Sequence, residues 1–256
     1  MSLKFPISLA GKRGGGGVPA PLHWWDLDSL STGIDDQGTS PWNRLQVRGS
    51  TPPPIISVGP NGQDVVNFTS NGQYLHYSNQ GITNVAWDGV SDTEMSQSFW
   101  FRVTSVSSQS NRMLVWRSSG GQPLITQTFI SNSSPDYARS MYWDESLQQS
   151  NAADETETTQ LATWYHLVST LNDGVCKLYL NNQLIATDTN PSFTTLSRTA
   201  VPFSLATASW NKGNTQFQHK GQMGMVGIWD TALTEDSINH LYNDGLGRQY
   251  ADLPAM

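Results

Sequence analysis

Short segments in which apolar and polar residues alternate recur along this chain. Ser98 to Val103 is one of them, and its alternation places Phe99, Phe101 and Val103 on one face. A period of two residues is typical of a β-strand that is covered on one side. Similar segments return about every eight to twelve residues, a spacing typical of all-β domains. Further strands are expected at residues 22–27, 65–68, 74–77, 113–116, 124–130, 164–171, 176–180, 184–186, 201–206 and 223–229.

Turn-forming residues separate these segments. Asn71-Gly72 favours a tight type I′ turn, so it predicts a hairpin between the strands at 65–68 and 74–77. Residues 28–63 are rich in Pro, Gly and Asp, which argues against a helix there. Residues 131–160 are polar throughout and are predicted to form a long loop.

One helix is predicted near the C-terminus. Thr234 is suited to the N-cap position, and the acidic pair that follows it complements the positive end of a helix dipole. Ile238, Leu241 and Tyr242 share one helical face, and Gly245 is placed to end the helix.

The order of these elements predicts a two-sheet antiparallel β-sandwich with one short C-terminal helix. We find no internal repeat and no sign of a second domain. The sandwich is expected to cover residues 21–250, between an N-terminal arm at 1–20 and a short tail at 251–256.

Two stretches of the chain resemble a known family. Trp164–Thr170, Asn172–Gly174 and Cys176–Ala186 are similar to the laminin-G-like signature W-x-H-V-x-x-T, then D-G, then L-Y-V-N-G-x-x-V-A. Gly221–Thr234 is similar to the closing strand of that family, and the resemblance extends over about residues 22–247. The chain thus resembles the laminin-G-like and pentraxin-type domains of the concanavalin A-like lectin/glucanase superfamily.

The resemblance implies a jelly-roll sandwich whose inward-facing residues should be buried. It also marks one departure, because Gly224 stands where the family usually has an acidic residue in its closing strand. Calcium needs several hard oxygen ligands, so this loss argues against a metal site carried over from the family. The core should include Phe99, Phe101, Leu178, Leu180, Val226 and Ile228.

Charge and cysteine content exclude several classes of protein. The formal net charge is −7 with only 14 basic residues, which argues against a nucleic-acid partner. The single cysteine, Cys176, allows no internal disulfide. No apolar run is long enough to span a bilayer, and the first ten residues are too polar for a secretory signal.

The acidic residues do not form a known catalytic motif. Retaining glucanases of this fold resemble one another in a Glu-x-Asp-x-x-Glu strand, where two carboxylates act as nucleophile and acid/base. None of the five Glu of this chain is followed two residues later by Asp, so we expect no enzyme. No cofactor is predicted, and the five His show no metal-ligand spacing. The candidates for a calcium ion are Asp136, Asp144, Asp154 and Glu155, and the alternative is a solvated polar loop.

Tryptophans beside short polar residues are the candidates for carbohydrate binding. Trp87-Asp88, Trp143-Asp144 and Trp210-Asn211 combine a flat apolar ring, which can stack on a sugar, with groups that bond its hydroxyls. The alternative is that each Trp caps the core of the sandwich. We therefore take Trp87, Asp88, Trp143, Trp210 and Asn211 as candidate carbohydrate-binding residues.

The N-terminal arm combines apolar and basic residues with a run of four glycines. Such a run cannot offset its ordering entropy by itself, so the arm is either a disordered tail or an extended segment that docks on another chain. Its candidate anchors are Phe5, Ile7 and Leu9, with Lys12 and Arg13 attracted to an acidic partner surface.

These observations favour a non-enzymatic recognition and assembly module, and we expect a surface, decoration or fibre protein of a virion such as a phage. The arm would contact other virion or scaffold chains, the protein would form a homo-oligomer, and cell-surface glycans are the expected ligands. No nucleic-acid partner and no membrane insertion are expected. The alternatives are a secreted bacterial carbohydrate-binding or adhesion domain in an extracellular location, and a structural protein without a sugar ligand.

Overall fold

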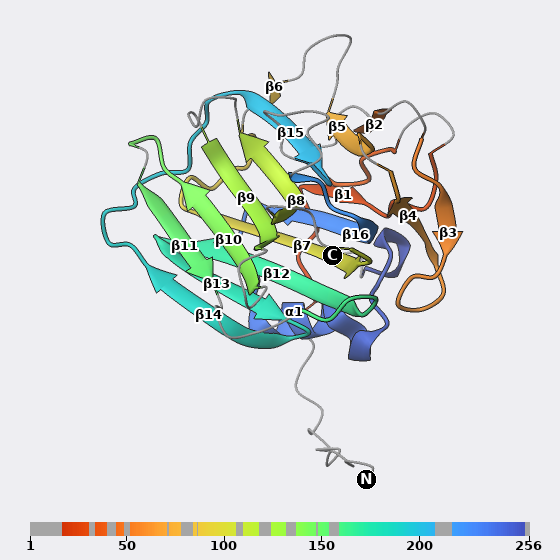
Figure 1. The fold of residues 1–256 in the computed structure, drawn as a ribbon. Helices are drawn as coiled ribbons and strands as arrows, with labels where there is room; N and C mark the ends of the chain where they lie inside the picture. Colours follow the sequence, from red (N-terminus) through yellow and green to blue (C-terminus); the bar gives the residue numbers. More distant parts are fainter. Residues whose placement is uncertain are drawn as a thin grey trace, which may run out of the picture.

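The computed structural model describes residues 17–30, 34–39, 45–48, 52–70, 72–77, 84–85, 87–105, 110–117, 124–131, 137–146, 148–153, 159–207 and 217–253. These residues form two antiparallel sheets that pack face to face, with one short helix on an outer face (Figure 1). The all-β sandwich predicted from the alternating pattern is confirmed.

Sheet A is built around its long central strands. Its spatial order is β14 (Gln183–Thr189), β13 (Val175–Leu180), β12 (Trp164–Asn172), β7 (Glu94–Val103), β16 (Gly221–Trp229), β4 (Asp64–Phe68) and β3 (Ile55–Ser57), and β1 (His23–Trp25) pairs with the second half of β16.

Sheet B lies in front of sheet A in the view of Figure 1. Its spatial order is β11 (Gln149–Ala153), β10 (Tyr137–Trp143), β9 (Leu124–Ser131), β8 (Ser110–Arg117), β15 (Val201–Leu205), β5 (Tyr74–Tyr77) and β2 (Leu45–Arg48), and β6 (Asn84–Val85) also pairs with β15.

The predicted hairpin around Gly72 is wrong. β4 pairs with β3 and β16 in sheet A, whereas β5 pairs with β2 and β15 in sheet B. The connection therefore crosses from one sheet to the other. Gly72 does adopt a positive φ of 85°, which glycine tolerates, so the turn residue serves an arch between sheets instead of a hairpin.

The long polar loop predicted at 131–160 is also wrong in part, because β10 and β11 occupy much of it. β11 has the sequence QSNAA and is stabilised by pairing with β10 from Arg139↔Ala153 to Trp143↔Gln149. Its small and polar residues have no intrinsic strand preference, so its conformation comes from a neighbour that the local sequence does not reveal.

The core between the sheets confirms the predicted inward-facing residues. Trp25 of sheet A stacks on Phe203 of sheet B with ring centroids 5.6 Å apart, and Trp116 meets Phe203 edge-on. All six predicted core residues are buried: Phe99, Phe101, Leu178, Leu180, Val226 and Ile228.

The bulge in β16 explains the family departure noted at Gly224. Pairing with β7 shifts register between Gly224 and Gly227, and Met225 has a φ of 50°. A Cβ at position 224 would lie 2.9 Å from a side-chain carbon of Val65. A glycine therefore fits this position, and a carboxylate side chain would have to displace the side chain of Val65.

A second apolar cluster covers the outer face of sheet A. The helix α1 (Glu235–Tyr242) contributes Ile238 and Leu241 to it, and Tyr242 stacks on Trp100 with centroids 5.8 Å apart. The short helices η2 (Asn243–Gly245) and η3 (Tyr250–Asp252) follow. Asn243, with φ 48°, forms the C-cap of α1, so Gly245 does not end this helix as predicted.

The sandwich begins a few residues earlier than position 21. Val18 is 1 % exposed within the cluster under α1, and the carbonyl oxygen of Pro19 accepts a hydrogen bond from the Trp229 indole. Residues 17–20 therefore belong to the sandwich, and the rest of the predicted arm, including Phe5, Ile7, Leu9, Lys12 and Arg13, lies outside the described residues. Within the described part of the chain, no helix is both long and apolar enough to cross a bilayer.

Candidate functional site

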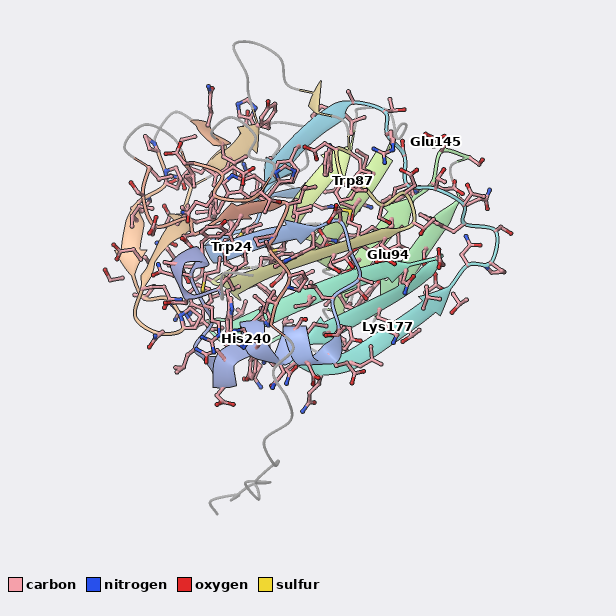
Figure 2. The ribbon with its side chains drawn as sticks, turned by 180° about the vertical axis from the view of Figure 1, so that it is seen from behind. Trp24, Trp87, Glu94, Glu145, Lys177 and His240 are labelled. Atoms are coloured by element: carbon pink, nitrogen blue, oxygen red, sulfur yellow. The ribbon has the colours of Figure 1, made fainter. Side chains whose placement is uncertain are left out.

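Three loops meet at one end of the sandwich and form a surface that we call the rim: residues 87–92, 143–146 and 190–198. The segment 190–198 joins the other two, because Ser197 donates its N–H to the Trp143 carbonyl at 3.2 Å and Leu196 donates to the Asp92 carbonyl. Arg198 donates to the Trp87 carbonyl at 3.2 Å. Trp87 and Glu145 lie at this same end in Figure 2. Two tryptophan motifs that are far apart in sequence are thus brought together.

Trp87 supports the rim from below. Its ring is 1 % exposed, meets Trp116 edge-on, and donates its indole N–H to the Ser91 carbonyl at 2.9 Å. This placement matches the core-capping alternative. Asp88 is exposed, and Val90 at the tip of the same loop is 90 % exposed. The loop therefore presents groups to solvent, whereas the Trp87 ring does not.

A histidine with two carboxylate partners anchors this loop. His23 Nδ1 lies 2.7 Å from an oxygen of Asp36, and His23 Nε2 lies 3.1 Å from an oxygen of Asp88. Burial lowers the pKa of His23, but the hydrogen bonds to the two carboxylates outweigh it, and the pKa is raised above 6.5. These two hydrogen bonds tie Asp36 and the 87–92 loop to His23 of β1.

Asp144 has a fastening role at the rim. It is fully buried, and its oxygens accept hydrogen bonds from the N–H of Gln148 at 2.8 Å and from the N–H and hydroxyl of Thr194 at 3.0 and 3.1 Å. These bonds hold the turn after β10 against residues 190–198. The other metal candidates, Asp136, Asp154 and Glu155, lie outside the described residues, and the described ones contain no cluster of three or more metal-ligating side chains.

The outer face of sheet B carries a second group of outward-facing side chains, which begins at Trp143 beside the rim. We call it the β8–β11 face and define it by Arg112, Gln127, Phe129, Arg139, Met141, Trp143 and Asn151. The pairing register of β8, β9 and β10 places three of these side chains in a first row, because Phe129 of β9 is the cross-strand partner of both Arg112 and Arg139. The second row runs from Gln127 through Met141 to Asn151.

The apolar members of the β8–β11 face form a separate small cluster. Phe129, Met141 and Trp143 pack together and are each less than 8 % exposed. Solvent-facing sides of antiparallel sheets usually carry polar residues, so an apolar cluster here is unusual. Because the cluster itself is buried, the partly exposed Arg112, Arg139 and Asn151 around it mark the face as a candidate ligand surface.

The polar members of the face lie around this cluster in fixed positions. The Arg112 guanidinium lies 3.8 Å from the centre of the Phe129 ring and donates to Gln127 Oε1 at 3.2 Å. The Arg139 guanidinium lies 5.9 Å from the same ring and donates to Asn151 Oδ1 at 2.7 Å. The face therefore presents guanidinium and amide groups above an apolar base.

Of the predicted carbohydrate-binding residues, Trp143 belongs to this face, and Trp87 and Asp88 belong to the rim. Trp210 and Asn211 lie outside the described residues. The sequence interpretation missed the other members of the face: Arg112, Gln127, Phe129, Arg139, Met141 and Asn151. The alternation in Tyr137–Trp143 was a usable signal for Arg139 and Met141, but their neighbours depend on the pairing of four strands.

A groove lies on the opposite side of the molecule, at the start of α1. It holds about 420 Å³ and is lined by β12, β13 and residues 232–235, with Lys177 and Glu235 as its charged groups. Lys177 lies on this side in Figure 2, which views the molecule from behind.

Among the described residues, two antiparallel sheets and one α-helix form a β-sandwich of the jelly-roll type. The family model Laminin_G_3, described as the concanavalin A-like lectin/glucanases superfamily, matches residues 69–239. The chain belongs to this superfamily. No curated protein matches the sequence significantly.

Several solved structures share the fold at low sequence identity. The binding domain of Paraclostridial Mosquitocidal Protein 1 superposes with a TM-score of 0.62 at 14 % identity, covering 88 % of this chain and 52 % of that one. The ligand binding domain of Botulinum neurotoxin serotype D, in complex with N-acetylneuraminic acid, gives a TM-score of 0.60 at 13 % identity over 88 % and 51 %. This chain therefore spans about half the length of these toxin domains.

One solved structure matches over almost its whole length. Domain 4 of AbnA, an extracellular arabinanase from Geobacillus stearothermophilus, in complex with arabinotriose, gives a TM-score of 0.58 at 16 % identity over 86 % of this chain and 97 % of that one. At these identities the likenesses establish the fold.

Proposed function

We propose that the protein is a non-catalytic saccharide-binding module whose ligand lies on the β8–β11 face beside the rim. The observation that carries this proposal is the row of fixed guanidinium and amide groups over the apolar cluster of Phe129, Met141 and Trp143. Saccharides expose many hydroxyls, so they suit a row of partly exposed guanidinium and amide groups that a packed apolar base holds in place.

The two outer faces of the sandwich differ in a way that supports this location. The outer face of sheet A is covered by α1 and the segments beside it, which bury Trp100, Val168 and Trp229. The β8–β11 face instead keeps Arg112, Arg139 and Asn151 partly exposed. A ligand can therefore reach polar groups on sheet B directly.

The absence of carboxylates in the strands of sheet B supports binding without hydrolysis. None of its eight strands contains Asp or Glu. Retaining hydrolysis requires two carboxyl groups about 5–5.5 Å apart on either side of the scissile bond. The fold likeness to a domain solved with arabinotriose adds a precedent for sugar binding by a sandwich of this size.

The test is a titration of the whole protein with an oligosaccharide panel that includes arabinotriose, cellotriose and 3′-sialyllactose. We expect millimolar or tighter binding of at least one member, reduced about fivefold by Asn151→Ala, because one amide contact is worth about 1 kcal/mol. Lys177→Ala on the opposite outer face is the matched control and should bind normally. Failure of every sugar to bind, or loss of binding in Lys177→Ala alone, would contradict the proposal or its location.

The biological setting is a separate proposal. We infer a virion-surface role from the lectin-type sandwich, which carries no disulfide, and from the glycine-rich segment before Val18, with an extracellular bacterial binding domain as the alternative. A purely structural role without a sugar ligand is the third candidate. The saccharide titration separates that role from the other two, and immunogold labelling of particles separates virion from extracellular placement.

A further inference from the structure

Charge is distributed unequally between the two sheets. The whole chain has 21 acidic and 14 basic residues. The strands of sheet A contain three acidic residues (Asp64, Glu94 and Asp188) and two basic ones (Arg102 and Lys177). The eight strands of sheet B contain four arginines and no acidic residue. An acidic protein therefore has one sheet whose strands carry positive charge only.

Two of these arginines converge on one aromatic ring. Phe129 pairs across the sheet with Arg112 on one side and Arg139 on the other. The two guanidinium carbons lie 3.8 and 5.9 Å from its ring centre. Stacking on an aromatic face fixes a guanidinium without neutralising it.

Two neutral amides of the sheet accept hydrogen bonds from this pair. Arg112 donates to the carbonyl of Gln127, and Arg139 donates from Nε to the carbonyl of Asn151. The two Nη groups of Arg139 have no acceptor among the residues that the structure describes. These amides orient the two guanidinium groups, and the open end of the Arg139 fork remains available to a ligand.

One carboxylate of sheet A lies close to β11 of sheet B, but it is hydrogen-bonded to β11 itself and not to the arginines. Asp188 of β14 accepts a hydrogen bond from the backbone N–H of Asn151 at 2.7 Å and lies 3.5 Å from the Ser150 hydroxyl. It thereby fastens β11 to the opposite sheet.

We propose that the β8–β11 face selects acidic saccharides, with the Arg139 guanidinium binding the ligand carboxylate. This inference rests on the proposed saccharide-binding function and names its ligand class. The planar fork of arginine matches a planar carboxylate with two parallel hydrogen bonds, which favours uronic and sialic acids over neutral sugars. The net charge of −7 disfavours long polyanions such as nucleic acids, since they would also meet the acidic remainder of the surface.

The experiment compares 3′-sialyllactose with lactose, and trigalacturonic acid with its methyl ester, by titration calorimetry on the whole protein. Each pair differs in its negative charge, and the methyl ester retains the sugar rings. We expect each acidic ligand to bind about tenfold or more tightly than its neutral partner. This preference should shrink when ionic strength rises from about 0.05 M to about 0.5 M.

Three variants assign the effect to Arg139. Arg139→Ala should remove the preference for acidic ligands. Arg139→Lys should retain only part of this preference, because lysine keeps the charge but lacks the planar fork of arginine. Asn151→Asp should remove the preference, because its carboxylate would pair with Arg139 within the protein. Lys177→Ala is the control for loss of one positive charge elsewhere. Unchanged melting temperatures show that each variant is folded.

The outcomes separate this inference from the proposed function. Equal binding of acidic and neutral partners, or an acidic preference that survives both Arg139→Ala and Asn151→Asp, overturns the inference and leaves saccharide binding intact. Binding of a DNA duplex as tightly as the acidic sugars also overturns it. If no sugar of either kind binds, the proposed function fails first.

Discussion

At the scale of single residues, the buried histidines link this fold to pH. His166 is fully buried in contact with Trp100, and its Nε2 lies 2.8 Å from the Ser98 hydroxyl. Burial lowers the pKa of His166 to about 3 and the pKa of His219 to about 4. Both imidazoles are therefore neutral in the folded protein near neutral pH, whereas the hydrogen bonds to Asp36 and Asp88 raise the pKa of His23.

We expect the free energy of unfolding to fall as pH drops below 6.5. The unfolded chain then binds protons at positions 166 and 219 that the folded protein does not, which costs about 1.4 kcal/mol per pH unit for each histidine. His23 has the opposite sign, since its raised pKa gives stability that is present below 6.5 and is lost as pH rises through the folded value. Urea unfolding between about pH 5 and pH 8 measures both effects.

The variant that isolates one of these groups is His166→Gln, which keeps a polar partner for Ser98 and does not titrate. Its stability should be lower at every pH, but its slope below pH 6.5 should be smaller by about 1.4 kcal/mol per unit. A slope equal to that of the unmodified protein would show that His166 does not titrate on unfolding as its burial implies.

At the scale of elements, local signals were reliable where an element is stabilised by its own residues. The helix is an example, because Thr234 accepts a hydrogen bond from the Ser237 N–H and so caps α1 as predicted. The strands β2, β3, β6, β10 and β11 were missed. β2 and β6 pair with strands far away in the sequence, whereas β3, β10 and β11 pair with a neighbouring strand and lie in segments rich in polar or turn-forming residues. An eight-residue helix is marginal alone, so α1 relies on this cap and on Ile238 and Leu241 beneath it.

We expect Thr234→Ala to destabilise the protein by about 1 kcal/mol, the usual cost of losing an N-cap side chain. Thr234→Ser retains the hydroxyl acceptor and should remain close to the unmodified protein. Guanidinium chloride unfolding of the three proteins measures the difference. Equal losses for the alanine and serine variants would indicate that the threonine methyl group, and not the cap, is the stabilising part.

At the scale of the whole molecule, the sandwich and the segment that precedes it are expected to have separate roles. Contacts with the described sandwich begin at Val18 and Pro19, which lie against β16 and the cluster under α1. The preceding segment combines glycines with apolar and basic side chains, a composition suited to docking on another chain.

Deletion of residues 2–16 should therefore leave the melting temperature nearly unchanged and reduce self-assembly or attachment to a partner. Differential scanning calorimetry and size-exclusion chromatography with light scattering test the two parts. Deletion of residues 2–19, which also removes Val18, is the contrasting variant and should lower the melting temperature. A truncated protein (2–16) that unfolds early, or assembles as before, would contradict the docking role.

The sequence by itself determined the strand-rich class, the family resemblance, the capped helix and the buried residues such as Phe99 and Val226, because hydrophobic alternation and capping act within a few residues. Only the tertiary structure decided which strands pair and in which register. Arg112, Phe129 and Arg139 come from three strands, and the row they form exists because those strands are hydrogen-bonded in one register. The rim likewise requires residues 190–198 to reach both Asp92 and Trp143. A shift of one residue in a strand would turn these side chains to the other face, so the candidate site is a property of the paired sheet and not of any single segment.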